Sequence, residues 1–268
     1  GSFFFAEVAL FAYGPLTVVA LRVSLAAVIL LIILRATGKA LPSGWGIWAA
    51  LAGMGLLNNV IPFSLIVWGQ VHVTSSIASI FNATTPRMTA NKLAGVLLGI
   101  AGVVVMIGPS ALAGFDMANA GQIAVLGGAL SYAFASIWGR RLKGLTPMVA
   151  AAGMLLMASV IMVPAALLLE TPLKVVPSLS VIASVIGLAS VSTALAYLIY
   201  FRLLSSVGST NLMLVTLLIP ISAMALGIAF LDEAPEASAF AGMLLIFAGL
   251  ISVDGRLYRK LKGRYLPE

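Results

Sequence analysis

The chain has 268 residues, of which 62% are hydrophobic and 9% are charged, and its mean hydropathy is +1.15. A soluble domain carries about 25% charged residues, so this composition excludes an ordinary soluble fold. The chain contains no cysteine, which excludes disulfides, zinc–thiolate centres and cysteine nucleophiles. Its net charge of +7 gathers at predicted helix ends and in the C-terminal stretch RLYRKLKGRYLPE, which indicates an anionic membrane surface and not nucleic acid.

Apolar runs of helical length alternate with short loops along the chain, without the period-2 pattern of barrel strands. We therefore predict an all-α polytopic membrane protein. The predicted spans are 1–12, 15–36, 44–69, 74–86, 91–108, 119–140, 147–169, 179–204, 208–231 and 236–254. Two of them, 1–12 and 74–86, are too short for a core of roughly 30 Å, since residues 74–86 cover about 20 Å at ~1.5 Å per residue.

The charges in the loops and near the ends of the spans form two sets that alternate along the chain. The basic set comprises Arg35, Lys39, Arg87, Lys92, Arg140, Arg141, Lys143, Arg202, Arg256, Arg259, Lys260, Lys262 and Arg264. The other set comprises Asp116, Glu170, Asp232, Glu233 and Glu236, with Lys174 as its only Lys or Arg. The positive-inside rule places the basic set and the C-terminus in the cytoplasm, provided that residues 74–86 cross the membrane.

An internal repeat accounts for the short span. VTSSIASIFNATTP (73–86) aligns with VGSTNLMLVTLLIP (207–220) at an offset of 134, and Pro15 aligns with Pro147 at an offset of 132. Beyond Pro86 the offset rises by 13, to 147, where Gly95 aligns with Gly242. We predict that the second half of helix 4, between Pro86 and Arg87, and the start of helix 1 are absent from the sequence. The complete fold would have ten transmembrane helices in two inverted five-helix repeats, 1–108 and 119–254, followed by a basic cytoplasmic tail, 255–268.

Several stretches resemble the drug/metabolite transporter superfamily, in particular the ten-helix exporters of the EamA type. They are GSFFF, VALRVSLAAVILL, NNVIPFSLIVWGQ, SIFNATTP, NKLAGVLLGIAGVVVMIG, ASVSTALAYLIYFRLL and FAGMLLIFAGLISV. The resemblance extends to about Val253, and the bacterial aromatic amino acid exporters are a similar branch. It implies secondary transport across a bacterial inner membrane and leaves the substrate open, because these motifs are shared among carriers of many cargos.

Polar and aromatic residues within the spans are candidates for binding substrate. Ser79 and Asn82 share one face of predicted helix 4, Thr216 lies on its repeat mate, and Asn58 lies mid-span beside Asn59. Each polar stripe serves either interhelical hydrogen bonds or a cavity, and each aromatic ring either packs or stacks on cargo. The predicted substrate-binding residues are Asn58, Ser79, Asn82, Tyr132, Trp138, Thr193, Tyr197 and Thr216.

Charged residues and prolines inside the spans suggest further roles. Glu7 and Arg22 reach similar depths and are predicted to form a structural ion pair, with an intramembrane proton site as the alternative. The predicted gate and hinge residues are Pro62, His72, Pro86 and Pro220, for which static kinks and a solvated histidine are the alternatives. One histidine does not make a metal cage, so no metal site is predicted.

The sequence as a whole predicts a secondary exporter of small amphipathic metabolites that works by alternating access. Aromatic amino acids and related toxic compounds are candidate cargos. The alternatives are a carrier of nucleotide or phosphorylated cargo and a membrane scaffold or lipid-handling protein. No catalytic motif is present, so we expect no enzyme activity and no cofactor. The expected partners are a small-molecule substrate and the lipid bilayer, with the chain as a monomer or weak homodimer.

Overall fold

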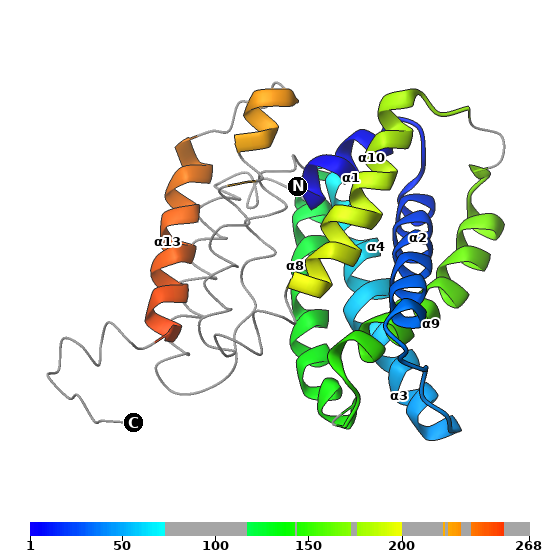
Figure 1. Cartoon of the computed structure of the whole chain (residues 1–268). Coiled ribbons are helices and arrows are strands. Elements are labelled where there is room, and N and C mark those ends of the chain that lie inside the picture. The colour runs from blue at the N-terminus through cyan, green and yellow to red at the C-terminus, as the bar shows by residue number, and fades with distance from the viewer. Residues whose placement is uncertain are drawn as a thin grey trace, which may run out of the picture.

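The computed structural model of the chain describes residues 1–72, 117–142, 144–172, 176–199, 222, 225–231 and 237–254 (Figure 1). Within these residues every regular element is a helix. The predicted spans 74–86 and 91–108, the predicted gap between Pro86 and Arg87, and the tail from residue 255 lie outside the described residues, so these predictions stay open.

The described helices follow the predicted spans closely. The α-helices are α1 (Ser2–Leu10), α2 (Pro15–Ala36), α3 (Trp45–Gly55), α4 (Ile61–Gln70), α8 (Met117–Trp138), α9 (Pro147–Leu169), α10 (Leu179–Ala189) and α13 (Ala237–Asp254). Two π-helices, η1 (Leu56–Val60) and η4 (Ser190–Leu195), and a 3₁₀ turn, η2 (Gly139–Leu142), adjoin them. Four helical segments of the described part are long and apolar enough to cross a membrane: Pro15–Ala36, Trp45–Gln70, Pro147–Leu169 and Leu179–Ile199.

Some of the described helices begin at spacings close to the offsets of the predicted repeat. Pro15 and Pro147 each stand at the first position of a helix, where the missing N–H of proline removes no hydrogen bond. Trp45 and Leu179 begin α3 and α10, 134 positions apart, and Leu56 and Ser190 begin the two π-helices at the same spacing. The π-helices are therefore a shared feature of the two related segments.

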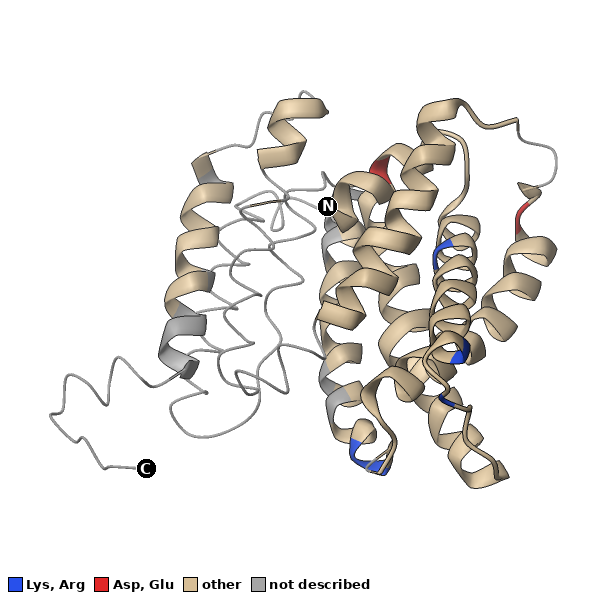
Figure 2. Cartoon of the chain, in the orientation of Figure 1, with Lys and Arg blue, Asp and Glu red and all other residues tan. Residues whose placement is uncertain are grey.

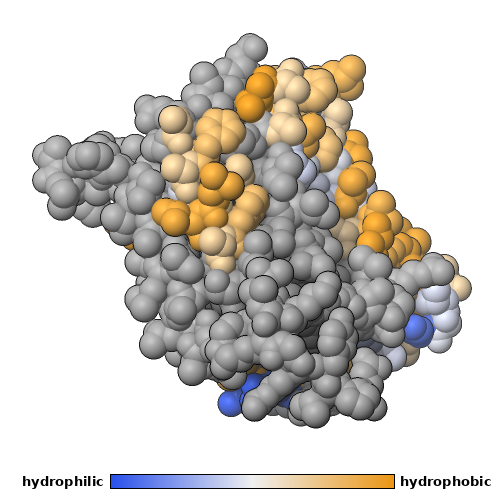
Figure 3. Space-filling model, turned by 90° about the vertical axis from the view of Figure 1, so that its left-hand side faces the viewer, coloured by the Kyte–Doolittle hydropathy of each residue, from blue (hydrophilic) through white to orange (hydrophobic). Residues whose placement is uncertain are grey.

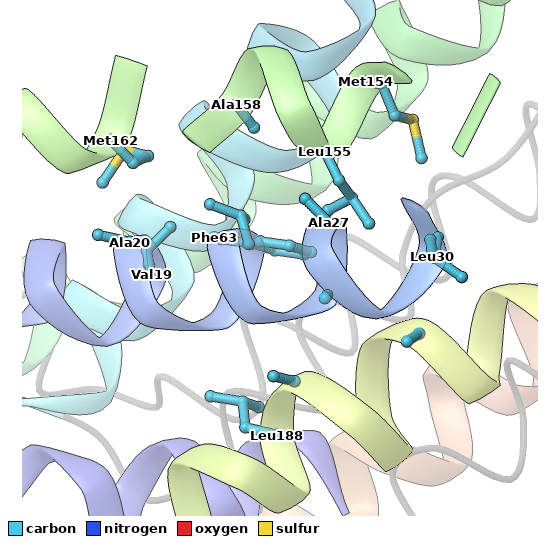
Figure 4. Packing of buried hydrophobic residues seen from close by; sticks show 14 of the residues in the cluster. Val19, Ala20, Ala27, Leu30, Phe63, Met154, Leu155, Ala158, Met162 and Leu188 are labelled. Carbon is cyan, nitrogen blue, oxygen red and sulfur yellow. The ribbon is translucent and has the colours of Figure 1, made fainter. Parts of the chain in front are cut away.

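Helices α2 and α9 form the centre of the fold and run antiparallel. The start of α2 is hydrogen-bonded to Glu170, just beyond the end of α9, and Thr37 at the end of α2 contacts Met148 at the start of α9. Both helices bury a stripe of repeat-related residues (Figure 4). The two stripes are Val19, Val23, Ala26 and Leu30 on α2, and Ala151, Leu155, Ala158 and Met162 on α9. Each residue of the α9 stripe is 132 positions after one of the α2 stripe, and the two helices pack antiparallel.

The outside of the described helices suits a bilayer. Large apolar side chains such as Ile32, Phe134 and Leu168 are exposed, and Figure 3 shows apolar residues over much of the visible described surface. Figure 2 shows acidic positions near one end of the bundle and most basic positions toward the other, where η2 joins α8 to α9. The described charges therefore separate as the positive-inside pattern predicts.

Glu170 links the end of α9 to the start of α2. Its carboxylate accepts hydrogen bonds from the backbone N–H groups of Leu16 (3.0 Å) and Thr17 (2.8 Å) and from the Thr17 hydroxyl (2.5 Å). The first N–H groups of a helix have no partner within the helix, and the helix dipole favours an anion there. Glu170 therefore caps α2 from the other half of the chain.

Replacing Glu170 with glutamine is expected to lower the free energy of unfolding by about 2 kcal/mol, because hydrogen bonds to a charged group contribute roughly 1.5–3 kcal/mol. Thermal unfolding in detergent measures the change. Thr17→Val removes one of the three hydrogen bonds and should destabilise the protein less. Wild-type stability in Glu170→Gln would contradict the cap.

Candidate functional site

The π-helix η1 and the proline that follows it leave a backbone carbonyl without a partner within the helix. The N–H of Ile61 donates a hydrogen bond to the carbonyl of Leu56, five residues earlier. In this π-helical pattern, the carbonyl of Leu57 would accept from the N–H of residue 62. Residue 62 is proline, which has no N–H. The hydroxyl of Ser131 on α8 donates to the Leu57 carbonyl over 2.7 Å instead. Pro62 thus follows a π-turn that a neighbouring helix holds, and its role as a hinge stays a prediction.

The π-turn places two amide side chains beside a tyrosine from the other half of the chain. Asn58 Nδ2 donates to the Tyr197 hydroxyl over 3.0 Å, and this hydroxyl donates to Asn59 Oδ1 over 3.2 Å. Asn58 Nδ2 also lies 3.9 Å from the sulfur of Met154. The structure therefore brings together two of the predicted substrate-binding residues, Asn58 and Tyr197.

Asn59 is fully buried, and its Nδ2 has no hydrogen-bond partner among the described residues. A buried amide donor without a partner costs about 1–3 kcal/mol. Such a group is retained either at a strained position or where a ligand supplies the acceptor. The sequence pattern favours neither role for Asn59.

The second π-helix, η4, carries a second polar contact between the halves. Arg22 Nε on α2 donates to Thr193 Oγ1 over 3.0 Å, and the Thr193 hydroxyl donates to the Leu188 carbonyl over 2.8 Å. The guanidinium carbon of Arg22 lies 3.6 Å from the centroid of the Phe63 ring on α4. Figure 4 shows Phe63 beside α2 and α9 in the packed centre of the fold. Thr193, one of the predicted substrate-binding residues, is therefore hydrogen-bonded to the buried cation Arg22.

Tyr132 on α8 belongs to the same region. It is half-buried against the apolar core, as is Tyr197, and both phenol groups are close enough to Arg22 to interact with it electrostatically. Asn58, Asn59, Arg22, Tyr132, Thr193 and Tyr197 together make up what we call the midspan cluster.

Trp138 makes its contacts elsewhere, at the basic end of the bundle. Its indole N–H donates to the Ala50 carbonyl over 2.9 Å, and Arg141 stacks on its ring at 3.9 Å. A Cβ atom added to Gly53 would come within 2.5 Å of the indole, so the ring packs tightly against α3. These are the contacts of an interfacial aromatic residue, and its role in binding substrate stays a prediction.

The described contacts of Glu7 and Arg22 are with different partners. Glu7 accepts a hydrogen bond from Gln70 Nε2 over 3.3 Å, and Gln70 also donates to the Phe3 carbonyl over 3.0 Å. Arg22 contacts Thr193 and Phe63, as described above. The ion pair between Glu7 and Arg22 stays a prediction.

The remaining site predictions are only partly described. His72 follows the end of α4, with its ring 4.8 Å from that of Trp68 in an edge-to-face arrangement. Its gating role stays a prediction. Ser79, Asn82, Pro86, Thr216 and Pro220 lie outside the described residues, so their predicted roles stay open too.

The family follows from comparison with known proteins. The model of the EamA-like transporter family matches residues 1–91 and 119–253, which is most of the chain. The chain belongs to the EamA-like transporter family. It is therefore a membrane transporter of the drug/metabolite transporter superfamily and a multi-pass membrane protein.

Relatives of this EamA-like transporter are named as an efflux pump and an inner membrane transporter. A probable amino-acid metabolite efflux pump of Salmonella typhimurium is 28% identical over 236 residues, covering 81% of this chain and 77% of the pump. The uncharacterized inner membrane transporter YedA of Escherichia coli K12 is 29% identical over 220 residues, covering 77% of this chain and 71% of YedA. A solved crystal structure with 20% sequence identity has a TM-score of 0.67 and covers 95% of this chain and 92% of its own, which shows that the fold is shared.

Proposed function

We propose that this transporter exports small amphipathic metabolites, amino acids among them, and binds them at the midspan cluster. The single observation that carries the proposal is that this cluster joins the two halves of the chain at two π-helices. Arg22 contacts Thr193, and Asn58 contacts Tyr197, across the related segments. Irregular helix and polar groups at membrane depth are tolerated where they are buried in protein or line a path for solutes.

The proposed transport cycle is alternating access by two inverted five-helix repeats. The antiparallel pairing of α2 with α9 through repeat-related stripes supports it, because a site at the junction of inverted repeats can be exposed to either side by the same movement of each half. The separated charges support an inner-membrane topology with a cytoplasmic C-terminus.

The names of the relatives support the choice of cargo. Two of them, from Salmonella typhimurium and Escherichia coli, are probable amino-acid metabolite efflux pumps. The half-buried tyrosines Tyr132 and Tyr197 offer an aromatic surface next to polar groups, which suits a cargo with one apolar and one polar end.

Purified protein in proteoliposomes tests the function. Counterflow of radiolabelled phenylalanine, tryptophan, threonine, leucine, a lipophilic cation and glucose 6-phosphate should show uptake of at least one amino acid above that of protein-free liposomes. Uptake of glucose 6-phosphate alone would favour a carrier of phosphorylated cargo, and no uptake of any solute would contradict the proposal.

A further inference from the structure

Arg22 is a cation buried within a membrane-spanning helix. It lies seven residues after the start of α2, a depth of about 10 Å at ~1.5 Å per residue, and is 9% exposed. A charge at such a position is costly unless a counter-charge or hydrogen bonds compensate it, and it marks a functional site by default. Arg22 therefore requires a counter-charge or hydrogen-bond acceptors that compensate its burial.

The protein fixes the plane of the guanidinium. Nε is bonded to Thr193 at 3.0 Å, Thr193 is held in turn by the Leu188 carbonyl, and the flat face lies 3.6 Å above the centre of the Phe63 ring. Within the described residues the guanidinium donates through Nε, which leaves the Nη amino groups for another acceptor. Because Thr193 holds the Nε edge and Phe63 covers one face, the Nη edge of the guanidinium points in a defined direction.

The acidic side chains described near α2 have other contacts. Glu170 binds the first turn of α2, and Glu7 accepts a hydrogen bond from Gln70. Asn59, whose oxygen is bonded to Tyr197, adds a buried Nδ2 donor without a described partner. Within the described residues, Arg22 Nη and Asn59 Nδ2 are thus donors of the midspan cluster without a described acceptor, and an anionic ligand would supply one.

We infer that Arg22 binds the carboxylate of the transported molecule, and that the cargo is a monocarboxylate with an apolar or aromatic body. Two nitrogens of a guanidinium match the two oxygens of a carboxylate in one plane. Tyr132 and Tyr197, which are half-buried, provide the aromatic surface for the rest of the molecule. This inference rests on the proposed export function and names the chemical class of its substrate.

A phosphorylated cargo fits this site less well. A phosphate monoester carries about −1.5 to −2 charges near neutral pH, whereas the described cluster has one cation, Arg22. A carboxylate carries one charge and is neutralised by one guanidinium. The second buried donor, Asn59 Nδ2, is uncharged.

Competition in the proteoliposome assay tests the inference. The panel amino acid with the highest counterflow is challenged with its unlabelled form, with its amide, which lacks the negative charge, and with its phosphonate analogue. For the wild-type protein the amide should compete at least about tenfold more weakly than the amino acid, as expected for the loss of one charge-assisted contact. In Arg22→Gln this ratio should fall to about one, and in Arg22→Lys, which keeps the charge without the flat edge, it should be intermediate.

Arg35→Gln is the matched control, because it removes an exposed cation in the last turn of the same helix and should leave the ratio at the wild-type value. A wild-type protein that transports an amino acid but accepts its amide or phosphonate equally well overturns the carboxylate assignment and leaves the export function standing. An Arg22→Gln protein with the wild-type ratio overturns it as well. If Arg22→Gln does not fold, the wild-type and Arg22→Lys ratios decide. Export of the lipophilic cation alone also overturns the inference, whereas no transport of any panel solute defeats the proposed function itself.

Discussion

Replacing Tyr197 with phenylalanine is expected to reduce the rate of amino acid counterflow by roughly tenfold or more. The hydroxyl accepts from Asn58, which also contacts the Met154 sulfur, and donates to Asn59, so its removal leaves the fully buried Asn59 Oδ1 without its described donor. An unpaired buried group costs about 1–3 kcal/mol, and about 1.4 kcal/mol corresponds to a tenfold change in an equilibrium constant. The affected residues follow one another in η1, so we expect the π-turn to lose its defined geometry.

Initial rates per reconstituted protein, together with the midpoint of thermal unfolding in detergent, measure this effect. Tyr13→Phe is the control, because Tyr13 is also half-buried against the core and lies after α1, away from the π-helices. A Tyr197→Phe protein with wild-type transport and stability would show that the hydroxyl chain has no role in the site.

The second large effect is expected from Gly55→Ala, at the junction of α3 and η1. A Cβ atom on Gly55 would lie 2.6 Å from the Met154 carbonyl oxygen and 3.2 Å from the Ala158 amide nitrogen, both in the backbone of α9. Backbone atoms of a packed helix do not move aside as the end of a side chain does. Overpacking of this kind costs typically 1–3 kcal/mol, so we expect a loss of about 2 kcal/mol in the free energy of unfolding and slower transport.

The same helix offers a matched control for this substitution. A Cβ atom on Gly46, also in α3, would have no other atom within 4 Å, so Gly46→Ala should be neutral or stabilising by up to about 1 kcal/mol. Equal unfolding midpoints for the two alanine variants would show that α3 and α9 do not depend on close contact at Gly55.

The sequence predicts the helices well where the signal is local, within the helix itself. Pro15 and Pro147 mark the starts of α2 and α9, because proline favours the first position of a helix wherever that helix lies in the fold. Apolar length and flanking charges then define the other end. The apolar runs predicted to begin at residues 44 and 179 likewise agree, within one residue, with the helix starts at Trp45 and Leu179.

Contacts that join distant segments are not predictable in this way. The position of Glu7 and Arg22 along their spans predicts the depth of each residue in the membrane. It does not predict the direction in which each side chain points around its helix. The role of Glu170 as a cap depends on residues more than 150 positions away. Phe63 reads as an ordinary apolar residue until its ring is found beneath Arg22.

The π-turns are likewise not predictable from the apolar pattern. A π-turn shifts a helix by one residue and leaves that pattern almost unchanged. The pair Asn58–Asn59 before Pro62 is the signal that the sequence offers, because two amides in mid-membrane need partners and proline removes one backbone donor. That pair predicts a kink or a binding site. The hydrogen bond from Ser131 to the carbonyl of Leu57 is known only from the structure.

The central claim, that cargo binds at the midspan cluster, is tested most directly by the reactivity of a single thiol there. The chain has no cysteine, so Asn58→Cys carries one thiol in an otherwise unreactive protein. We expect a charged, membrane-impermeant methanethiosulfonate to modify this thiol in both right-side-out and inside-out vesicles, and the transported amino acid to slow the reaction. A thiol that reacts fully only after denaturation, or at a rate that the cargo does not change, would contradict binding at this cluster.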